Sequence, residues 1–165
     1  MRRIAPLLLL LIISLCGCAV KDSSPLECIS DTLNSSNAPS FYIAANIPAQ
    51  AVLTDSCNDG CCAIFSHEDY EIYQEIFPAS NLNEALFHLT GRTDLPLIQT
   101  NDFPMEEYRL TYLAAGEGGT QAFYGKLIFD GTHCYSLIAH CPAEKQAEYE
   151  EVFSDLLALS TLQAI

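Results

Sequence analysis

Apolar and polar residues alternate most regularly in the last third of the chain, where the pattern predicts a hairpin followed by a helix. Gln121–Phe129 and Thr132–His140 have the alternation of two strands, and Asp130-Gly131 lies between them. An Asp-Gly pair favours a tight hairpin turn, because that turn needs residues that accept a positive φ. This unit is the part of the sequence around which we expect the rest to pack.

A two-residue turn would place Leu127 opposite Cys134 and Phe123 opposite Ile138, with all four side chains on one face. The opposite face then carries a second apolar set, Tyr124, Ile128, Tyr135, Leu137 and Ala139. Since both faces are apolar, we expect each to be covered by other parts of the chain.

Pro142–Leu162 follows the hairpin and has the pattern of an amphipathic helix. Proline suits the first helical position, where no backbone donor is needed. Apolar residues recur at helical spacing, namely Tyr149, Val152, Phe153, Leu156, Leu157 and Leu159. Acidic residues near the start favour the helix dipole, namely Glu144, Glu148, Glu150 and Glu151.

Upstream, four short alternating segments predict an antiparallel meander. They are Phe41–Ile47, Ala51–Ser56, Cys62–Ser66 and Tyr70–Phe77. Pro48 closes the first of them, and polar turn residues separate the others. We therefore expect these segments to pair in chain order.

Between the meander and the final hairpin, the pattern predicts a second helix and two more strands. Asn81 and Glu84 form a capping box, and Gly91 provides the stop signal ten residues after Asn81. Leu95–Thr100 reads as a short edge segment and Glu107–Ala115 as a longer strand. Near the start of the domain, a capping box and the stripe Leu26, Ile29 and Leu33 predict a short helix.

The assembled order predicts an α/β (α+β) fold, an α/β/α sandwich around a mostly antiparallel sheet. The closing strand Cys134–Pro142 with the helical segment Glu144–Leu162, together with the early Phe41-Tyr42-Ile43 strand that ends at Pro48, resembles PsbP-like domains. That resemblance implies a central antiparallel sheet between helices and a role in binding or stabilising larger assemblies. It implies no catalytic motif.

The first residues predict export and lipid anchoring. Arg2 and Arg3 precede the apolar run Ile4–Leu15, which is too short to span a bilayer but suits a signal-peptide core. The run ends in Leu15-Cys16-Gly17-Cys18, which resembles the bacterial lipobox, apart from a cysteine at its second position. We therefore predict a signal peptide over 1–17, lipidation of Cys18, a tether over 18–24 and one globular domain over 25–165, facing outside the cytoplasm.

Charge narrows the range of partners. The chain of 165 residues has a formal net charge of −14, and the segment from Cys18 onward has 5 Lys and Arg against 21 Asp and Glu. An acidic surface repels phosphate backbones and anionic lipid, so we expect no nucleic-acid partner. The membrane contact predicted here depends on the lipid anchor, and the expected partner is a protein of the cell envelope.

Six cysteines remain after Cys18, and an even number in an exported domain favours disulfides. Cys57 and Cys62 would lie opposite each other if Asp59-Gly60 is a two-residue turn. A three-residue turn would pair Cys57 with Cys61 instead. Both pairings remain open at this stage.

The competing interpretation of the cysteines is a thiol redox or metal site. His133-Cys134 and His140-Cys141 add soft ligands to the Cys57–Cys62 hairpin. Adjacent strand residues point to opposite faces, however, and residues six or more apart lie about 20 Å from each other. A thioredoxin-like pair is absent, and the loop around Cys57 lacks the carboxylates of a calcium site.

The sequence contains no motif typical of a hydrolase, a metalloprotease or a phosphate-binding loop. We expect the aromatic strand residues Tyr108, Tyr112, Tyr124 and Tyr135 to pack in the sheet and core, unless several prove exposed together and mark a binding patch. The sequence therefore predicts a non-catalytic binding or assembly-support lipoprotein without a cofactor. The alternative is a redox or metal-handling lipoprotein.

Overall fold

The structure is a computed structural model that describes residues 38–56, 61–101, 105–116 and 118–165. The signal peptide, Cys18, the tether and the short helix predicted around Leu26 lie outside these residues and stay predictions. The described elements are β1 (Phe41–Ala44), β2 (Val52–Ser56), β3 (Cys62–Ser66), β4 (Glu71–Pro78), α2 (Leu82–Thr90), β5 (Leu97–Asn101), β6 (Glu106–Gly116), β7 (Gly119–Phe129), β8 (His133–Pro142), η2 (Ala143–Lys145), α3 (Gln146–Leu159) and β9 (Thr161–Ala164).

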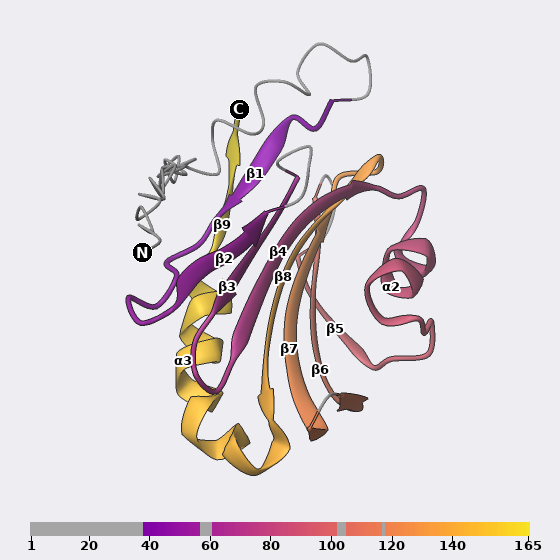
Figure 1. The fold of residues 1–165 in the computed structure, drawn as a ribbon. Helices are drawn as coiled ribbons and strands as arrows, with labels where there is room; N and C mark the ends of the chain where they lie inside the picture. Colours follow the sequence, from indigo (N-terminus) through magenta and orange to yellow (C-terminus); the bar gives the residue numbers. More distant parts are fainter. Residues whose placement is uncertain (1–37, 57–60, 102–104, 117) are drawn as a thin grey trace, which may run out of the picture.

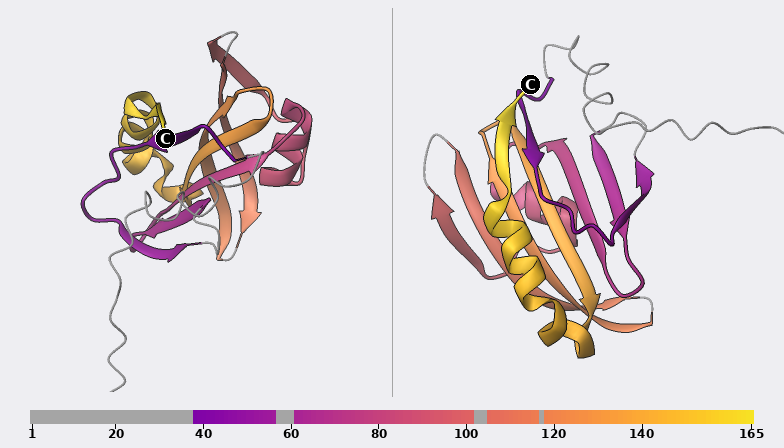
Figure 2. Two further views of the ribbon diagram at one scale, coloured as in Figure 1. Left: turned by 90° about the horizontal axis from the view of Figure 1, so that it is seen from above. Right: turned by 90° about the vertical axis from the view of Figure 1, so that its left-hand side faces the viewer.

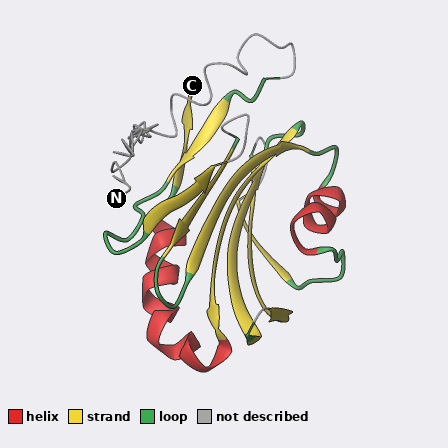
Figure 3. Cartoon of the chain, in the orientation of Figure 1, coloured by secondary structure: helices red, strands yellow, loops and turns green. Residues whose placement is uncertain are grey.

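A seven-stranded sheet forms the middle layer, in the order β2-β3-β4-β8-β7-β6-β5. Every neighbouring pair in it is antiparallel. Figure 1 and Figure 3 show α3 on one side of this sheet and α2 on the other. The predicted sandwich with a central antiparallel sheet is confirmed. Neither described helix is long and apolar enough to cross a membrane.

The α3 side of the sheet is closed. Strands β1 and β9 form a separate two-stranded sheet that lies next to α3 on this side, as both views in Figure 2 show. The side chains buried between these layers come from all of them, and include Ile43, Ile72, Tyr135, Leu137, Phe153 and Leu157. Burial of this set stabilises the fold mainly through the hydrophobic effect.

The α2 side is covered over only part of its length. Helix α2 begins as the sequence predicts, because the Asn81 side chain accepts a hydrogen bond from the Glu84 backbone N–H at 3.0 Å. It ends at Gly91, whose φ of 68° suits a residue without a side chain. The buried residues beneath it come from one end of the sheet, namely Phe77, Leu110, Leu127 and Cys134.

One prediction about strand pairing and one about the end of a helix were wrong. Strand β1 does not join the meander, because Phe41–Ala44 pairs with β9. The final helix ends at Leu159 rather than at Leu162: Ser160 is extended, with φ −72° and ψ 139°, and the next residues form β9. Four residues are too few to predict a strand by themselves, even though polar and apolar residues alternate in Thr161–Ala164, and they become a strand by pairing with β1.

The predicted register of the final hairpin was also wrong, and it differs from the observed register by two residues. Phe129 pairs with Cys134, and Phe123 pairs with His140. The turn is longer because the Asp130 side chain accepts hydrogen bonds from the backbone N–H groups of Thr132 and His133, at 2.8 and 2.7 Å. A shift of two residues leaves every side chain on its predicted face, so the prediction of two apolar faces is confirmed.

Candidate functional site

The structure describes two of the three cysteines of the predicted hairpin site, Cys61 and Cys62. Cys18 and Cys57 lie outside the described residues, while Cys62 begins β3 and is disulfide-bonded. Cys61 lies just before that strand and is half-buried. The pairing of Cys57 with Cys62 or with Cys61 therefore stays a prediction.

The cysteines of β8 are packing residues. Cys134 and Cys141 are each 0 % exposed, and they lie in the cores on opposite sides of the sheet. Burial raises the pKa of the Cys134 thiol to about 12 and also raises the pKa of Cys141. Because the thiolate is the reactive and metal-binding form, neither thiol suits redox or metal chemistry at neutral pH. Within the described residues, no group of three His, Cys, Asp or Glu side chains could hold a metal ion.

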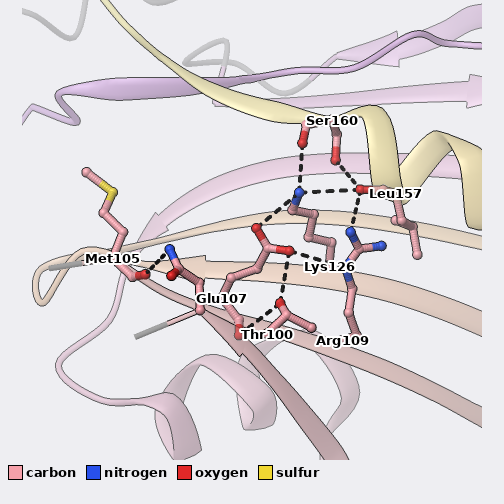
Figure 4. Close-up of polar contacts among 8 residues, drawn as sticks. Thr100, Met105, Glu107, Arg109, Lys126, Leu157 and Ser160 are labelled. Atoms are coloured by element: carbon pink, nitrogen blue, oxygen red, sulfur yellow. Dashed lines mark hydrogen bonds and ion pairs between the residues drawn. The ribbon is translucent and has the colours of Figure 1, made fainter. Parts of the chain in front are cut away.

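A buried polar centre lies on the α3 side of the sheet, around the Lys126 ammonium (Figure 4). Lys126 is 3 % exposed and donates to the backbone carbonyls of Ser160 at 2.7 Å and Leu157 at 3.3 Å. Its Nζ also lies 3.1 Å from Oε2 of Glu107. Arg109 donates a further hydrogen bond, at 2.7 Å, to the Leu157 carbonyl.

This centre satisfies the end of α3. The last carbonyls of a helix have no partner within it, and a cation there also interacts favourably with the helix dipole. Burial lowers the pKa of Lys126, and the Glu107 carboxylate opposes that shift. All the donors of this centre are directed at the helix end and at Glu107, so we assign it a structural role in holding α3 on the sheet.

The candidate binding surface lies on the α2 side, on the half of the sheet that α2 leaves uncovered. Four rings from four adjacent strands stack across it, and we call them the aromatic ladder: Tyr112 of β6, Phe123 of β7, His140 of β8 and Tyr73 of β4. Their successive ring centroids lie 4.8, 5.0 and 5.5 Å apart. The interplanar angles are 7°, 28° and 18°, so each ring covers the face of the next.

One carboxylate holds the β4 end of the ladder. Glu71 accepts hydrogen bonds from the Tyr73 hydroxyl at 2.5 Å and from the Ser66 hydroxyl at 3.3 Å. His140 Nε2 lies 3.3 Å from the same carboxylate. The Tyr73 hydrogen bond lowers the pKa of Glu71 against the opposing effect of burial, and burial lowers the pKa of His140. At neutral pH the pair is therefore a carboxylate next to a neutral imidazole.

Cavities flank the ladder on both sides. The larger, of about 470 Å³, reaches toward the turn between β3 and β4 and is lined by Glu68, Asp69 and Gln121 among others. The smaller, of about 290 Å³, lies toward α2 and is lined by Glu75 and His88 among others. Tyr73, Phe123 and His140 line both cavities, so the two adjoin at the ladder, and we call them together the groove.

The polar groups of this groove do not have the order of a hydrolytic triad. A nucleophilic serine needs a direct hydrogen bond to an imidazole, which is oriented in turn by a carboxylate. Here Glu71 lies between Ser66 and His140 and contacts both, so the Ser66 hydroxyl donates to a carboxylate and not to the imidazole. The arrangement suits the recognition of a bound group.

Comparison with known proteins reaches the fold and no further. No protein-family model and no curated protein sequence matches this chain. LpqN of Mycobacterium tuberculosis, described as involved in cell envelope biogenesis, has a similar structure, with a TM-score of 0.50 and 9 % identity over 78 % of this chain and 87 % of that one. Cyanobacterial PsbP (CyanoP) from Synechocystis sp. PCC 6803 gives a TM-score of 0.53 and 8 % identity over 75 % and 93 %. The PsbP-like fold predicted from the sequence is confirmed.

The ladder was not predicted from the sequence. The four strand tyrosines were predicted to pack in the sheet and core, and this is confirmed: Tyr124 and Tyr135 are buried on the α3 side, and Tyr108 and Tyr112 pack, partly buried, against the core on the α2 side. Tyr112 also stacks on Phe123 and so belongs to the ladder. Tyr112, Phe123 and His140 could have been grouped by the alternation of their strands, but only the correct register brings them side by side.

Proposed function

We propose that this protein is a membrane-anchored surface lipoprotein that acts as a non-catalytic binding or assembly-support module of the bacterial cell envelope. The lipobox-like segment that ends at Cys18 supports the anchor and the extracytoplasmic side. The described involvement of LpqN in cell envelope biogenesis, on a similar fold, supports the envelope role by analogy.

The observation that carries the proposal is the uncovered half of the α2 side. A sheet face with four stacked rings between two cavities is an amphipathic surface that is only half-buried by its own chain. Concave surfaces with apolar walls and a few convergent polar groups are the usual places for binding. We assign the partner-binding site to this groove.

The lipid anchor has a direct test. Changing Cys18 to Ala should move the protein from the membrane fraction to the soluble fraction, because two acyl chains on that sulfur are the predicted attachment. The measurement is fractionation of cells with detection of the protein in each fraction. A Cys18→Ala protein that still needs detergent for release contradicts the anchor.

The binding site is tested in intact cells with a photoreactive residue in place of Glu68, which is exposed and lines the larger cavity. The matched control places the same residue at Glu150, which is exposed on α3. We expect a discrete envelope protein to be crosslinked from the groove position only, and the adduct to be lost when Phe123→Ala is added. The same adducts from both positions, or none from the groove, contradict a binding site there.

The redox or metal-handling alternative receives no support from the described cysteines. Cys134 and Cys141 are buried with raised pKa values, and Cys62 is in a disulfide. Alkylation of the native protein before mass spectrometry tests this alternative at the remaining thiols. Mass added at several cysteines, or a bound metal, would favour it over the binding module.

A further inference from the structure

We propose that the groove across the aromatic ladder binds an extended, basic segment of a partner protein, with lysine or arginine side chains directed at the β4 carboxylates. This inference rests on the proposed function and names the chemistry of the occupant. It is carried by the charge of the described surface, by the partly exposed carboxylates of β4 and by the orientation of the ladder rings.

Among the described residues, every Lys and Arg side chain is already paired with a carboxylate. Among the described residues, Asp and Glu outnumber Lys and Arg by 15 to 4. All four of those cations lie in ion pairs with carboxylates: Arg92 with Asp94, Arg109 and Lys126 with Glu107, and Lys145 with Asp69. An acidic partner would therefore meet repulsion with nothing to offset it, whereas a basic partner would be attracted over a long range.

The groove itself contains accessible negative charge. The Glu71 and Glu75 side chains are 40 % and 34 % exposed, and one oxygen of Glu75 contacts His88 Nε2 at 2.9 Å. The groups bound to Glu71 are hydroxyls and an imidazole whose pKa is lowered by burial, so they leave its charge in place at neutral pH. Glu68, at the far end of the larger cavity, is exposed. A carboxylate can accept several hydrogen bonds, so a bound cation adds to these contacts instead of replacing them.

The ladder favours a peptide over a sugar as the occupant. Sugar rings bind to open aromatic faces, but within the ladder the faces of Phe123 and His140 are covered by neighbouring rings. Rings that stack along the sheet present their edges outward. Such a surface suits the aliphatic stems of lysine and arginine, which lie along apolar atoms while their charged ends reach a carboxylate.

The geometry of β4 also sets a spacing for the ligand. Glu71, Tyr73 and Glu75 alternate along one strand and share the α2-side face. Residues four apart on a strand are separated by about 13 Å. An extended segment that lies over the α2-side face along β4 would therefore match both carboxylates with two basic residues four positions apart.

The test uses the full-length chain in neutral detergent and a defined probe, a peptide of about 12 residues with lysines four apart and one terminal tryptophan. The protein has no tryptophan, so fluorescence of the peptide reports binding directly. We expect saturable binding that weakens with salt. A peptide with glutamate in place of each lysine should not bind, and one with its lysines three apart should bind about tenfold more weakly, because they then point to opposite faces.

Variants locate the binding on the protein. Glu71→Gln should weaken binding of the lysine peptide about tenfold. Glu75→Gln should weaken it by a similar factor, and this second variant tests the site without changing the contacts of Glu71 with the ladder. Glu150→Gln on α3 is the control and should change the affinity less than about twofold. Equal weakening by Glu150→Gln, equal binding of both lysine spacings, or tight binding of the glutamate peptide overturns the proposal.

The two proposals can fail separately. If the photoreactive residue at position 68 captures a partner in cells while the basic peptide does not bind the purified protein, the binding module stands and the basic occupant is wrong. If the peptide binds according to charge and spacing while no crosslink forms in cells, the chemistry of the groove stands and its use in the envelope is wrong.

Discussion

The two faces of the seven-stranded sheet share the strands β4, β8, β7 and β6 but differ in how far other parts of the chain cover them. On the α3 side, Phe153 and Tyr135 are 0 % exposed, and β1, β9 and α3 together close the face. On the α2 side a nine-residue helix covers one half, and the aromatic ladder occupies the other. The first face has the composition of a core, and the second changes along its length from a core to a groove.

The difference teaches which part of this fold can bind. A closed face contributes stability and tolerates little change, because loss of a buried side chain leaves a cavity. A substitution on a half-covered face lowers the free energy of unfolding less, and a ligand can replace the water on that face. We therefore expect substitutions on the α3 side to change the free energy of unfolding, and substitutions on the ladder to change binding.

The largest expected effect compares one phenylalanine from each face. Phe153→Ala should lower the free energy of unfolding by about 4 kcal/mol, because it empties a fully buried site. Phe123→Ala should lower it by about 1–2 kcal/mol, because this half-buried ring loses its stacking contacts to Tyr112 and His140 while the backbone remains paired. Urea unfolding curves measure both. Equal losses would contradict the contrast between the two faces.

The next effect concerns the ends of α3. Lys126→Met should cost about 3 kcal/mol, because it removes the donor to the Leu157 and Ser160 carbonyls and leaves Glu107 without its closest cation. Lys145→Met is the matched control at the start of the same helix. Its ion pair with Asp69 is partly exposed, so we expect a much smaller shift of the unfolding midpoint. Comparable shifts in the two variants would show that burial does not decide the value of these pairs.

The smallest expected effect is a pH dependence that originates in the ladder. Burial lowers the pKa of His140 from its ordinary value of 6.5, between the rings of Phe123 and Tyr73 and next to Glu71. The unfolded state therefore takes up a proton first as the pH falls through 6.5, and stability decreases with acidification. Unfolding midpoints measured from about pH 7.5 to about pH 5 should show this slope, and His140→Gln should flatten it.

Glu71 adds to the same trend at lower pH. Its pKa is lowered from 4.5, mainly by the Tyr73 hydrogen bond, so its contribution is present above 4.5 and is lost as the pH falls through the lowered value. If the dependence of the unfolding midpoint on pH between about 7.5 and about 5 is the same in His140→Gln as in the unsubstituted protein, the group that titrates in this range is not His140.

Much of the fold follows from local signals that the sequence carries. Asn81, Glu84 and Gly91 set the ends of α2 through hydrogen bonds and backbone conformations within a few residues of each other. The period of two along β6, β7 and β8 predicted the face of each side chain. These assignments are correct although the predicted hairpin register was not, because a shift by an even number of residues keeps each side chain on its face.

Other features required the tertiary structure. The pairing of β1 with β9 joins segments more than a hundred residues apart, and neither short strand shows its partner in its own pattern. The longer hairpin turn depends on hydrogen bonds to the Asp130 side chain, which residue spacing does not reveal. The extent to which α2 covers its face depends on where a nine-residue helix lies over a much longer sheet.

The sequence by itself therefore determined most of the elements, the two apolar faces and the acidic character of this protein, since each depends on residue type and short-range spacing. Only the tertiary structure decided that Tyr73, Tyr112, Phe123 and His140 stack into one ladder and that β4 carboxylates border it. The physical reason is that register and layer contacts join residues distant in the chain, and these contacts are chosen by packing of the whole domain.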